Sequence, residues 1–247
     1  MIFIFLPAYN EEIALPRLVK KFAEQMKAEG EDYRIVVLDD GSSDQTARVA
    51  SGLSKEYPLE LLRHPQNKGL GITMRDGIEH LVKTSGDEDL VVTLDCDDTH
   101  EPKYLPAALK KIREGYEVVI LSRYCPGGGE MGLSPLKTFL SRGAGFFLGV
   151  FFPIRGVKEF SCGYRVYRAS ILKKAVRVFG PDLVRLPHLG FVVTPEILIK
   201  MRMLGARIAE SPFVLRYDQK PTRSTNKSLK TIHGYFALLW NYWGRKA

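Results

Sequence analysis

Residues Leu90–Pro102, LVVTLDCDDTHEP, form the stretch of sequence that decides the fold and around which the other motifs are arranged. It opens on an apolar run typical of a short buried strand, and three carboxylates follow, on Asp95, Asp97 and Asp98. Because Asp95 and Asp97 are two residues apart, an extended chain places both on one face, about 6.5 Å apart along the strand. That spacing suits one shared hard divalent ion, which can also hold a diphosphate; a solvated acidic turn is the alternative.

Similar apolar runs recur along the chain, separated by segments with helical periodicity. The strand-like runs are Ile2–Leu6, Arg34–Leu38, Leu59–Arg63, Leu90–Leu94, Glu117–Ser122 and Arg207–Arg216, the last with Pro212 at an edge position. Short strands that alternate with helices predict an α/β fold with a mostly parallel central sheet flanked by helices. Ligands of such sheets bind outside the carboxyl ends of the strands.

Polar clusters directly follow four of these runs. They are Pro7–Glu11, Asp39–Asp44, Asp95–Thr99 and Ser122–Tyr124. Because parallel strands end at the same edge of a sheet, we expect the four clusters to converge there. That convergence favours a ligand site over a plain acidic turn.

The chain after residue 125 has a different character. Residues Ser134–Phe152 are apolar and unusually aromatic, with Lys137 and Arg142 as their only charges. This composition favours a re-entrant or interfacial helix pair; a buried helix is the alternative. A closing helix, Leu229–Trp243, is apolar on almost every face, and its Trp and Tyr side chains suit a membrane–water boundary or packing on the rest of the protein.

Bulk composition limits the classes of function. The chain has 247 residues and a formal net charge of +8, which favours anionic partners such as nucleic acid, lipid headgroups or phosphorylated substrates. The basic residues are scattered and no nucleic-acid motif is present, so a nucleic-acid-binding module is disfavoured. Cys96, Cys125 and Cys162 have no zinc-ligand or disulfide-framework spacing, which fits a reducing compartment. The start of the chain is not typical of a signal peptide, and no run reaches the length of a transmembrane helix; we expect a protein that is soluble or lies on a membrane.

Seven motifs point to one family. Four lie in the first part of the chain: PAYNEE (Pro7–Glu12), VVLDDGSSDQT (Val36–Thr46), NKGLG (Asn67–Gly71) and LDCDDTHEP (Leu94–Pro102). Together they resemble the inverting family 2 glycosyltransferases, which share the GT-A fold. Three later motifs are similar to those of the polyprenyl-phosphate branch, typified by dolichol-phosphate mannosyltransferase: SRY (Ser122–Tyr124), SRG (Ser141–Gly143) and SCGYRVYR (Ser161–Arg168).

The resemblance covers nearly the whole chain and implies its organisation. It implies one Rossmann-like GT-A domain over residues 1–247, with a nucleotide-sugar-binding half at 1–125 and an acceptor- or membrane-facing half at 126–247. The C-terminal part would supply acceptor-binding and interfacial amphipathic helices.

The resemblance also implies a donor site. Residues that would bind the nucleotide sugar are Pro7, Tyr9, Glu11, Asp39, Asp40, Lys68 and Asp95. Within this set Asp39 or Asp40 would contact base and ribose, because carboxylates accept hydrogen bonds from base N–H and sugar O–H groups.

A metal ion would lie next to the diphosphate in this donor site. Asp95 and Asp97 would hold Mg²⁺ or Mn²⁺, and Asp97 would be catalytic through this ion, which neutralises the leaving nucleoside diphosphate. Thr99 stands where mannosyl-phosphate synthases often carry Gln, and Asp98 has no assigned role.

On the acceptor side, the resemblance points to three basic residues. Arg123 and Arg142 match phosphate-holding arginines of the branch and would also be catalytic, since a guanidinium suits bidentate phosphate contact. Lys227 is a third candidate, in a loop that departs from the family's R-x-x-G-x-S-K pattern. A lipid monophosphate is already an anion, so it needs orientation and charge compensation more than a strong base.

The leading hypothesis is therefore transfer of a hexose, with mannose from GDP-mannose as the first choice, to a polyprenyl phosphate at the cytoplasmic face of a membrane. It includes peripheral membrane association, a separate membrane-anchoring subunit as a possible partner, and no nucleic acid. The alternative is a family 2 enzyme that uses another nucleotide sugar, such as a UDP-hexose, and a soluble or glycan acceptor.

Overall fold

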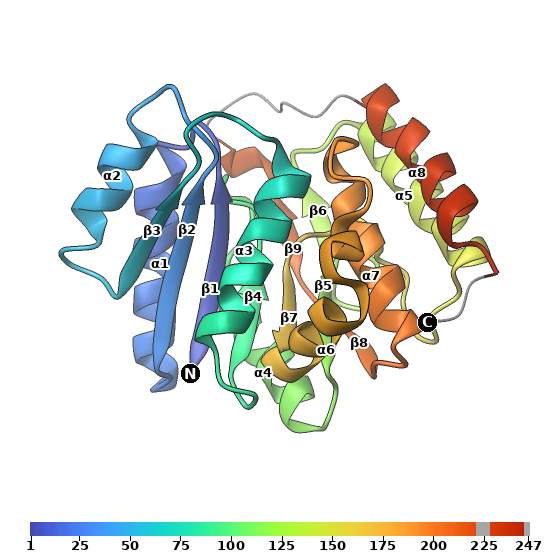
Figure 1. Ribbon diagram of the computed structural model, residues 1–247, viewed down its shortest axis with the longest axis horizontal. Helices are drawn as coiled ribbons and strands as arrows, with labels where there is room; N and C mark the ends of the chain where they lie inside the picture. Colours follow the sequence, from blue (N-terminus) through green and yellow to red (C-terminus); the bar gives the residue numbers. More distant parts are fainter. Residues whose placement is uncertain (221–227, 245–247) are drawn as a thin grey trace.

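The computed structural model describes residues 1–220 and 228–244, with a seven-stranded sheet at its centre in the order β3-β2-β1-β4-β7-β5-β8 (Figure 1). The strands are β1 (Ile2–Ala8), β2 (Tyr33–Asp39), β3 (Leu59–Arg63), β4 (Leu90–Thr93), β5 (Val118–Ser122), β7 (Arg165–Arg168) and β8 (Ile208–Pro212). In this part of the chain only β7 runs antiparallel to its neighbours. The mostly parallel α/β architecture expected from the sequence is confirmed.

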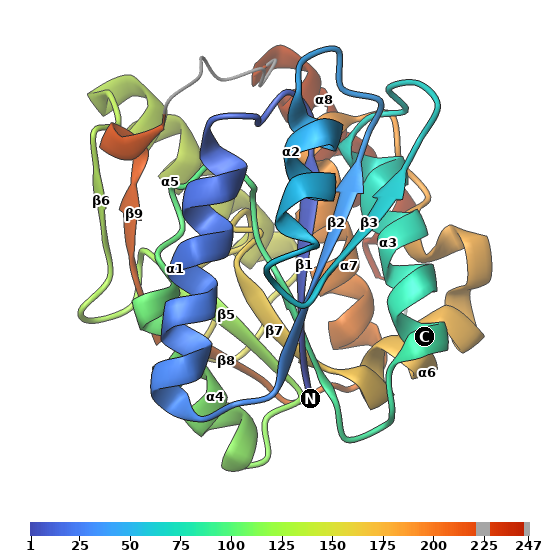
Figure 2. The same ribbon diagram turned by 90° about the vertical axis from the view of Figure 1, so that its left-hand side faces the viewer.

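Helices cover both faces of this sheet. The helices are α1 (Ala14–Glu29), α2 (Thr46–Leu53), α3 (Leu70–Thr84), α4 (Leu105–Arg113), α5 (Pro135–Phe151), α6 (Ala169–Phe179), α7 (Val193–Met203) and α8 (Ser228–Tyr242), with short 3₁₀ turns η1 (Pro102–Tyr104), η2 (Gly180–Val184), η3 (Gly190–Val192) and η4 (Tyr217–Gln219). Helices α1, α2 and α4 pack on one face, whereas α3, α6 and α7 pack on the other. Figure 2 shows α1 and α3 on opposite sides of β1–β3.

Strand β1 shows how the apolar runs divide between the two faces. Ile4 packs in the core cluster beneath α1, whereas Phe5 packs in the cluster beneath α3, because successive side chains of a strand point to opposite faces. Burial on both sides explains why the run is continuously apolar instead of alternating. At Gly77 of α3, an added Cβ would lie 2.0 Å from the Phe5 ring, so glycine allows this helix to approach the strand.

Two expectations from the sequence were wrong. Residues Ser134–Phe152 form the single helix α5, capped by Ser134, and no helix pair. The buried-helix alternative fails too, because Leu148 alone among the described residues of α5 is buried. The expected strand Arg207–Arg216 is two strands: β8 pairs with β5, and β9 (Val214–Arg216) pairs with β6 (Gly129–Met131) in a separate sheet.

The break between β8 and β9 follows from edge chemistry. Pro212 ends β8, which is the outermost strand of the sheet, and a proline is tolerated there because it has no N–H to donate to a further strand. The predicted edge position of Pro212 is confirmed. Beyond it the chain leaves the sheet and runs as β9 and η4 toward the loop that follows β4.

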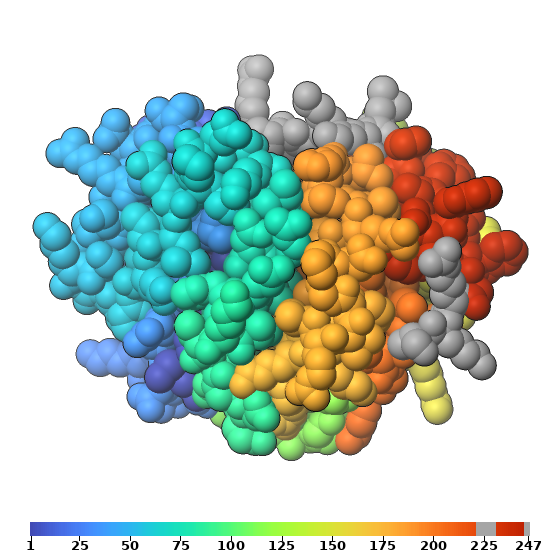
Figure 3. Space-filling view, in the orientation of Figure 1, coloured from blue at the N-terminus to red at the C-terminus, as the bar shows by residue number. Residues whose placement is uncertain are grey.

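Helices α5 and α8 lie side by side away from the sheet (Figure 1). Phe147 meets Phe236 at 5.5 Å between ring centroids, and Phe151 meets Trp243 at 6.0 Å. Large apolar side chains on this pair stay exposed: Leu136, Phe139, Phe146, Val150, Phe236, Trp240 and Trp243. In Figure 3 the side chains of α8 (red) project from the margin of the molecule. In the described ranges no helix combines the length and apolar character needed to cross a bilayer.

Strands β7 and β8 come from the part of the chain after residue 126, yet they join the same sheet as β1–β5. The division into a nucleotide-sugar half and an acceptor half stays a prediction.

Candidate active site

A cavity of about 540 Å³ opens at the carboxyl edge of the sheet. Its polar lining includes Asp95 and Asp97 after β4 and Arg123 after β5, which confirms that these strand ends meet. Its apolar lining comes mainly from α5 and α8, with Phe139 and Phe236 among the side chains. The cavity thus joins an acidic and a basic group to an aromatic wall.

The loops after β1 and β2 are bonded to each other at the same edge. Asn10 N–H donates to Ser42 Oγ at 2.9 Å, and Glu11 N–H donates to Thr46 Oγ1 at 2.8 Å. Asn10 has a φ of 58°, in the left-handed region that Asn tolerates better than most residues. Its side-chain oxygen accepts the N–H of Ser43 at 2.9 Å. These contacts bring the first two polar clusters together as expected.

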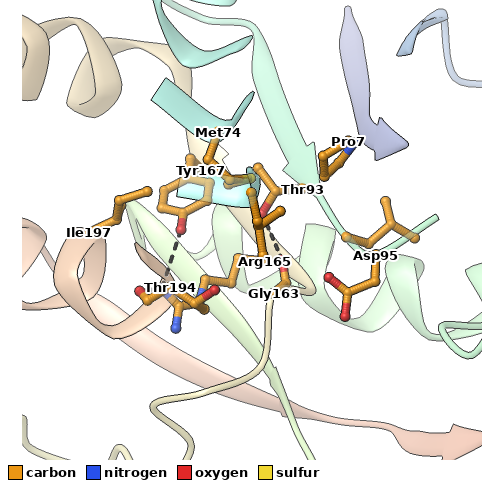
Figure 4. Close-up of a pocket in the computed structure, with 11 residues that line it drawn as sticks. Pro7, Met74, Thr93, Asp95, Gly163, Arg165, Tyr167, Thr194 and Ile197 are labelled. Carbon is orange, nitrogen blue, oxygen red and sulfur yellow. Dashed lines mark hydrogen bonds between the residues drawn. The ribbon is translucent and has the colours of Figure 1, made fainter. Parts of the chain in front are cut away.

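Asp95 is partly buried and lies against the backbone of the SCGYR segment. A Cβ on Gly163 would lie 3.3 Å from Asp95 Oδ1, so glycine allows the close approach. Burial raises the pKa of Asp95, and Asp97 adds to the rise while His100 opposes it. Figure 4 shows Asp95 beside Pro7 at a small neighbouring cavity of about 10 Å³, which has room for about one water and none for a substrate.

Asp97 is held by two side chains. Its Oδ1 accepts a hydrogen bond from Thr99 Oγ1 at 2.6 Å, and its Oδ2 accepts one from Lys220 Nζ. Burial by itself would raise the pKa of Asp97, but the Lys220 ammonium, with help from His100 and these hydrogen bonds, lowers it. Thr99 and Lys220 therefore both bind the Asp97 carboxylate directly.

Glu11 adds a third carboxyl group to this corner. Burial, followed by the charge of Asp97, raises the pKa of Glu11 to about 8, although Lys220 opposes the rise. Glu11 Oε2 is buried and finds no hydrogen-bond partner among residues 1–220 and 228–244. Repulsion from neighbouring carboxylates thus favours the protonated form of Glu11, and the Lys220 ammonium partly offsets that effect.

Asp98 has a structural role that the sequence did not reveal. It accepts a hydrogen bond from Lys21 Nζ at 2.7 Å, which ties the acidic loop to α1. Its φ of 62° is unusual for a residue other than glycine, and such strained positions cluster at functional sites.

Asp39 and Asp40 differ in the atoms that they leave available. Asp40 accepts hydrogen bonds from the backbone N–H groups of Lys68 (2.9 Å) and Gly69 (2.8 Å) and lies 2.7 Å from His64 Nδ1. It therefore organises the NKGLG loop. Asp39 Oδ1 accepts the Ser42 N–H at 3.0 Å, whereas its Oδ2 has no hydrogen-bond partner in the described ranges and faces Arg63 Nε at 3.1 Å.

The remaining donor-site candidates lie around this edge. Tyr9 is exposed, Pro7 lines the small cavity and Lys68 Nζ lies 3.8 Å from Asp76. His64 was missed by the sequence analysis, although it bridges Asp40 and Asp76. A single histidine after a strand gave no pattern to single it out.

Arg123 is almost fully buried and held in one orientation. Glu159 accepts hydrogen bonds from its Nε (2.7 Å) and Nη2 (3.0 Å), and Nη2 also reaches the hydroxyls of Ser141 and Ser161. Burial by itself would lower the pKa of Arg123, but the fully buried Glu159 raises it above its usual range. The third nitrogen, Nη1, lies 3.6 Å from Glu130. A fixed guanidinium therefore borders the cavity.

The other two candidates for binding the acceptor phosphate are Arg142 and Lys227, and neither is seen to border the cavity as Arg123 does. Arg142 is exposed on α5 and is absent from the cavity lining, whereas its neighbours Ser141 and Gly143 belong to that lining. Lys227 lies outside the described residues. Their proposed contact with an acceptor phosphate stays a prediction.

The donor set suits a divalent ion shared with a substrate. Asp95 and Asp97 offer hard carboxylate oxygens from one loop, and the described ranges hold no group of three or more His, Cys, Asp or Glu side chains that would form a protein-only metal site. Mg²⁺ in particular is commonly held by one or two carboxylates together with substrate phosphates. These residues therefore fit an ion that a diphosphate helps to bind.

Comparisons with known proteins agree with this geometry. A family model described as "Glycosyl transferase family 2" matches residues 3–176. The chain is 30% identical over 211 residues to a dolichol-phosphate mannosyltransferase from Pyrococcus furiosus, covering 85% of this chain and 55% of that protein. It is 29% identical over 220 residues to a dolichyl-phosphate beta-glucosyltransferase from Trichomonas vaginalis, covering 85% and 64%. The chain thus spans about half to two thirds of the length of these relatives.

A solved structure shares the fold. The crystal structure of glucosyl-3-phosphoglycerate synthase from Mycobacterium tuberculosis in complex with Mn²⁺ and UDP-glucose superposes with a TM-score of 0.65 at 20% identity, covering 98% of this chain and 79% of that chain. The likeness confirms the GT-A type of α/β fold. Because the family model matches more than half of its residues, this chain belongs to glycosyl transferase family 2.

Proposed function

We propose that the protein transfers a hexose from a nucleoside-diphosphate sugar to a polyprenyl phosphate, with inversion at the anomeric carbon and with GDP-mannose as the leading donor. The observation that carries the proposal is the composition of the cavity. One cavity joins the carboxylates of Asp95 and Asp97, the guanidinium of Arg123 and an aromatic wall from α5 and α8. A nucleotide diphosphate, a phosphate and a prenyl chain need these three surfaces.

On the donor side, Asp95 and Asp97 would hold Mg²⁺ or Mn²⁺ next to the diphosphate. When bound, such an ion neutralises charge on the leaving nucleoside diphosphate. Asp39 Oδ2, which faces Arg63 Nε at 3.1 Å, would accept a base N–H, whereas the oxygens of Asp40 are engaged by the NKGLG loop. Pro7, Tyr9 and Glu11 would border the nucleotide from the loop after β1.

On the acceptor side, Arg123 would orient the lipid phosphate for attack on the anomeric carbon. Its Nε and Nη2 are engaged by Glu159, so the phosphate would approach Nη1, which lies 3.6 Å from Glu130. A phosphate monoester is an anion near neutral pH and needs no strong general base. Orientation and charge compensation then lower the barrier, and Arg142 and Lys227 would add positive charge nearby.

The prenyl chain would lie along the apolar wall of the cavity, and we propose that the exposed aromatic side chains beside it rest on a membrane. Trp240 is 89% exposed and Phe146 is 76% exposed, which is costly in water for such large apolar groups. Aromatic residues of this kind favour the membrane interface. Peripheral association would bring the cavity to a lipid acceptor, with or without a separate anchoring subunit.

The direct test incubates the purified protein with Mn²⁺, a polyprenyl phosphate and one radiolabelled donor at a time, GDP-mannose, UDP-glucose or another nucleotide sugar. We expect a lipid-linked labelled product, lost on addition of EDTA. Absence of lipid-linked product from every donor would refute the proposal. Labelled product on a soluble phosphorylated acceptor alone would replace it with the soluble-acceptor alternative.

A further inference from the structure

Lys220 brings a positive charge close to the carboxylates of Asp95 and Asp97, which the proposed function assigns to a metal. Its Nζ donates to Asp97 Oδ2, and its ammonium also acts electrostatically on Asp95 and Glu11. The side chains of Lys220 and Asp97 are 14% and 9% exposed, respectively. The contact is therefore a mostly desolvated ion pair, unlike a surface pair screened by water.

The position of Lys220 is set by the segment that carries it. This segment, β9 and η4, follows the break after Pro212 and lies against the acidic loop. Arg216 N–H donates to Thr99 O at 3.0 Å, and Arg216 Nη1 lies 3.9 Å from Glu101. Lys220 also lines the large cavity. The path of the backbone thus places the Lys220 ammonium beside Asp97, on the side that faces the large cavity.

Lys220 and a divalent ion cannot both contact Asp97 Oδ2 at the same time. The ammonium occupies Oδ2, while Thr99 occupies Oδ1. Two cations on one carboxylate also repel each other strongly where water is largely excluded. Binding of a metal therefore requires Lys220 to withdraw from Asp97.

We propose that Lys220 is the resident counter-ion of this carboxylate cluster and that a divalent ion binds by displacing it. In the metal-free protein the lysine limits repulsion among Asp95, Asp97 and Glu11. It thereby stabilises the arrangement of these carboxylates before a metal binds. The same contact lowers metal affinity, because displacement of the lysine is part of every binding event. The inference rests on the proposed function in placing the metal at Asp95 and Asp97.

The test titrates Mn²⁺ into metal-free protein by electron paramagnetic resonance, without nucleotide or acceptor. Lys220→Met removes the competitor and a like charge, so we expect Mn²⁺ to bind about tenfold more tightly than in wild type, the factor expected for loss of one charge-assisted hydrogen bond. Lys21→Met is the matched control, because it removes the lysine that pairs with Asp98 on the same loop. Its Mn²⁺ affinity should stay within about twofold of wild type.

Unchanged or weaker Mn²⁺ binding by Lys220→Met would overturn the inference, as would an equal gain in Lys21→Met. A second measurement uses wild-type protein, so the inference can still be tested if Lys220→Met does not fold. The Nζ of Lys220, slowed in exchange by its desolvated ion pair, should give an ammonium ¹H–¹⁵N signal in metal-free protein that disappears when diamagnetic Mg²⁺ is added. Persistence of that signal in Mg²⁺-saturated protein would also overturn the inference.

Failure of this experiment is distinct from failure of the proposed function. Metal–lysine exchange without any lipid-linked product would leave the exchange standing and refute the transfer reaction. Lipid-linked product together with an unchanged Mn²⁺ affinity of Lys220→Met would refute the exchange and leave the transfer reaction standing.

Discussion

The polar and apolar walls of the cavity are built in opposite ways. On the polar wall, Asp97 and Arg123 are buried, and their hydrogen bonds and ion pairs define one orientation for each. On the apolar wall, α5 buries only Leu148 among its described residues, and α8 meets it through aromatic contacts. Charges need fixed partners because an unpaired buried charge is costly, whereas an aromatic surface gains its free energy from area and tolerates many arrangements.

This contrast indicates which wall would select the substrate and which would adapt to it. A wall with fixed charges suits the phosphates, whose geometry does not vary between substrates. A wall of exposed aromatic groups suits a partner of variable length, such as a prenyl chain or a lipid surface. Five predictions test this contrast.

The largest effect is expected at the polar wall. Asp97→Ala removes a carboxylate proposed to hold the metal and leaves Lys220 unpaired. We expect kcat/KM for lipid-linked product to fall by about a thousandfold. The measurement is the radiolabel assay, with circular dichroism to establish that the variant is folded. Activity within about tenfold of wild type would remove Asp97 from the catalytic residues.

The second prediction concerns the buried partner of Arg123. Glu159→Gln removes the two short hydrogen bonds of Arg123 to a carboxylate and leaves the longer 3.6 Å ion pair to Glu130. We therefore expect the free energy of unfolding at pH 7 to fall by about 3 kcal/mol. Glu88→Gln is the matched control: its ion pair with Arg168 is 3.8 Å long and Glu88 is 96% exposed, so the change should stay within about 0.5 kcal/mol. Denaturant unfolding measures both. Equal losses in the two variants would contradict the contrast between buried and surface pairs.

The same carboxylate predicts a pH dependence. Burial would raise the pKa of Glu159, but Arg123 and several hydrogen bonds lower it below its usual 4.5. Its contribution to stability is therefore present above pH 4.5 and is lost as the pH falls through the lower folded value. Wild type should lose stability below about pH 4.5 more steeply than Glu159→Gln.

The fourth prediction addresses the apolar wall. Replacement of Phe139, Phe146 and Trp240 by serine should change the free energy of unfolding by less than about 0.5 kcal/mol for each residue, because these side chains are exposed. Binding to vesicles that contain anionic lipid should weaken by about tenfold or more. Sedimentation with vesicles gives the partition. Unchanged partition would argue against membrane docking through α5 and α8.

The smallest effect is expected where the apolar wall has a polar anchor. Tyr242 O–H at the end of α8 donates to the buried Glu196 at 2.5 Å, and Glu196 also accepts the backbone N–H of Arg185 at 2.9 Å. Tyr242→Phe should cost about 1 kcal/mol of stability. Hydrogen exchange should speed up in α8 and stay unchanged in β1. Uniform acceleration across the sheet would show that the anchor serves the whole fold.

The sequence was a good guide wherever neighbouring residues carried the signal. The apolar runs and the rule that ligands bind at the carboxyl ends of parallel strands predicted the sheet and the meeting of Asp95, Asp97 and Arg123. The helix pair expected at Ser134–Phe152 was wrong, because composition indicates an apolar surface but does not say where one helix stops. Arg142 illustrates the same limit, since a motif does not report which side of a helix faces a cavity.

The residues that sequence reasoning missed are distant partners of residues that it found. Lys220 contacts Asp97 across 123 positions of the chain, and Glu159 contacts Arg123 across 36. No spacing rule reaches across such separations, because the chain path decides which segments meet.

Local patterning of apolar and charged residues was enough to predict the α/β class, the acidic loop after β4 and the family. The three-dimensional arrangement was needed to show that Asp40 binds the NKGLG loop while Asp39 Oδ2 faces Arg63. It was also needed to show that Glu159 orients Arg123 and that Lys220 compensates Asp97. The physical reason is that a buried charge is stabilised by whatever opposite charge or donor the fold brings within hydrogen-bond distance. That partner is chosen by packing in three dimensions.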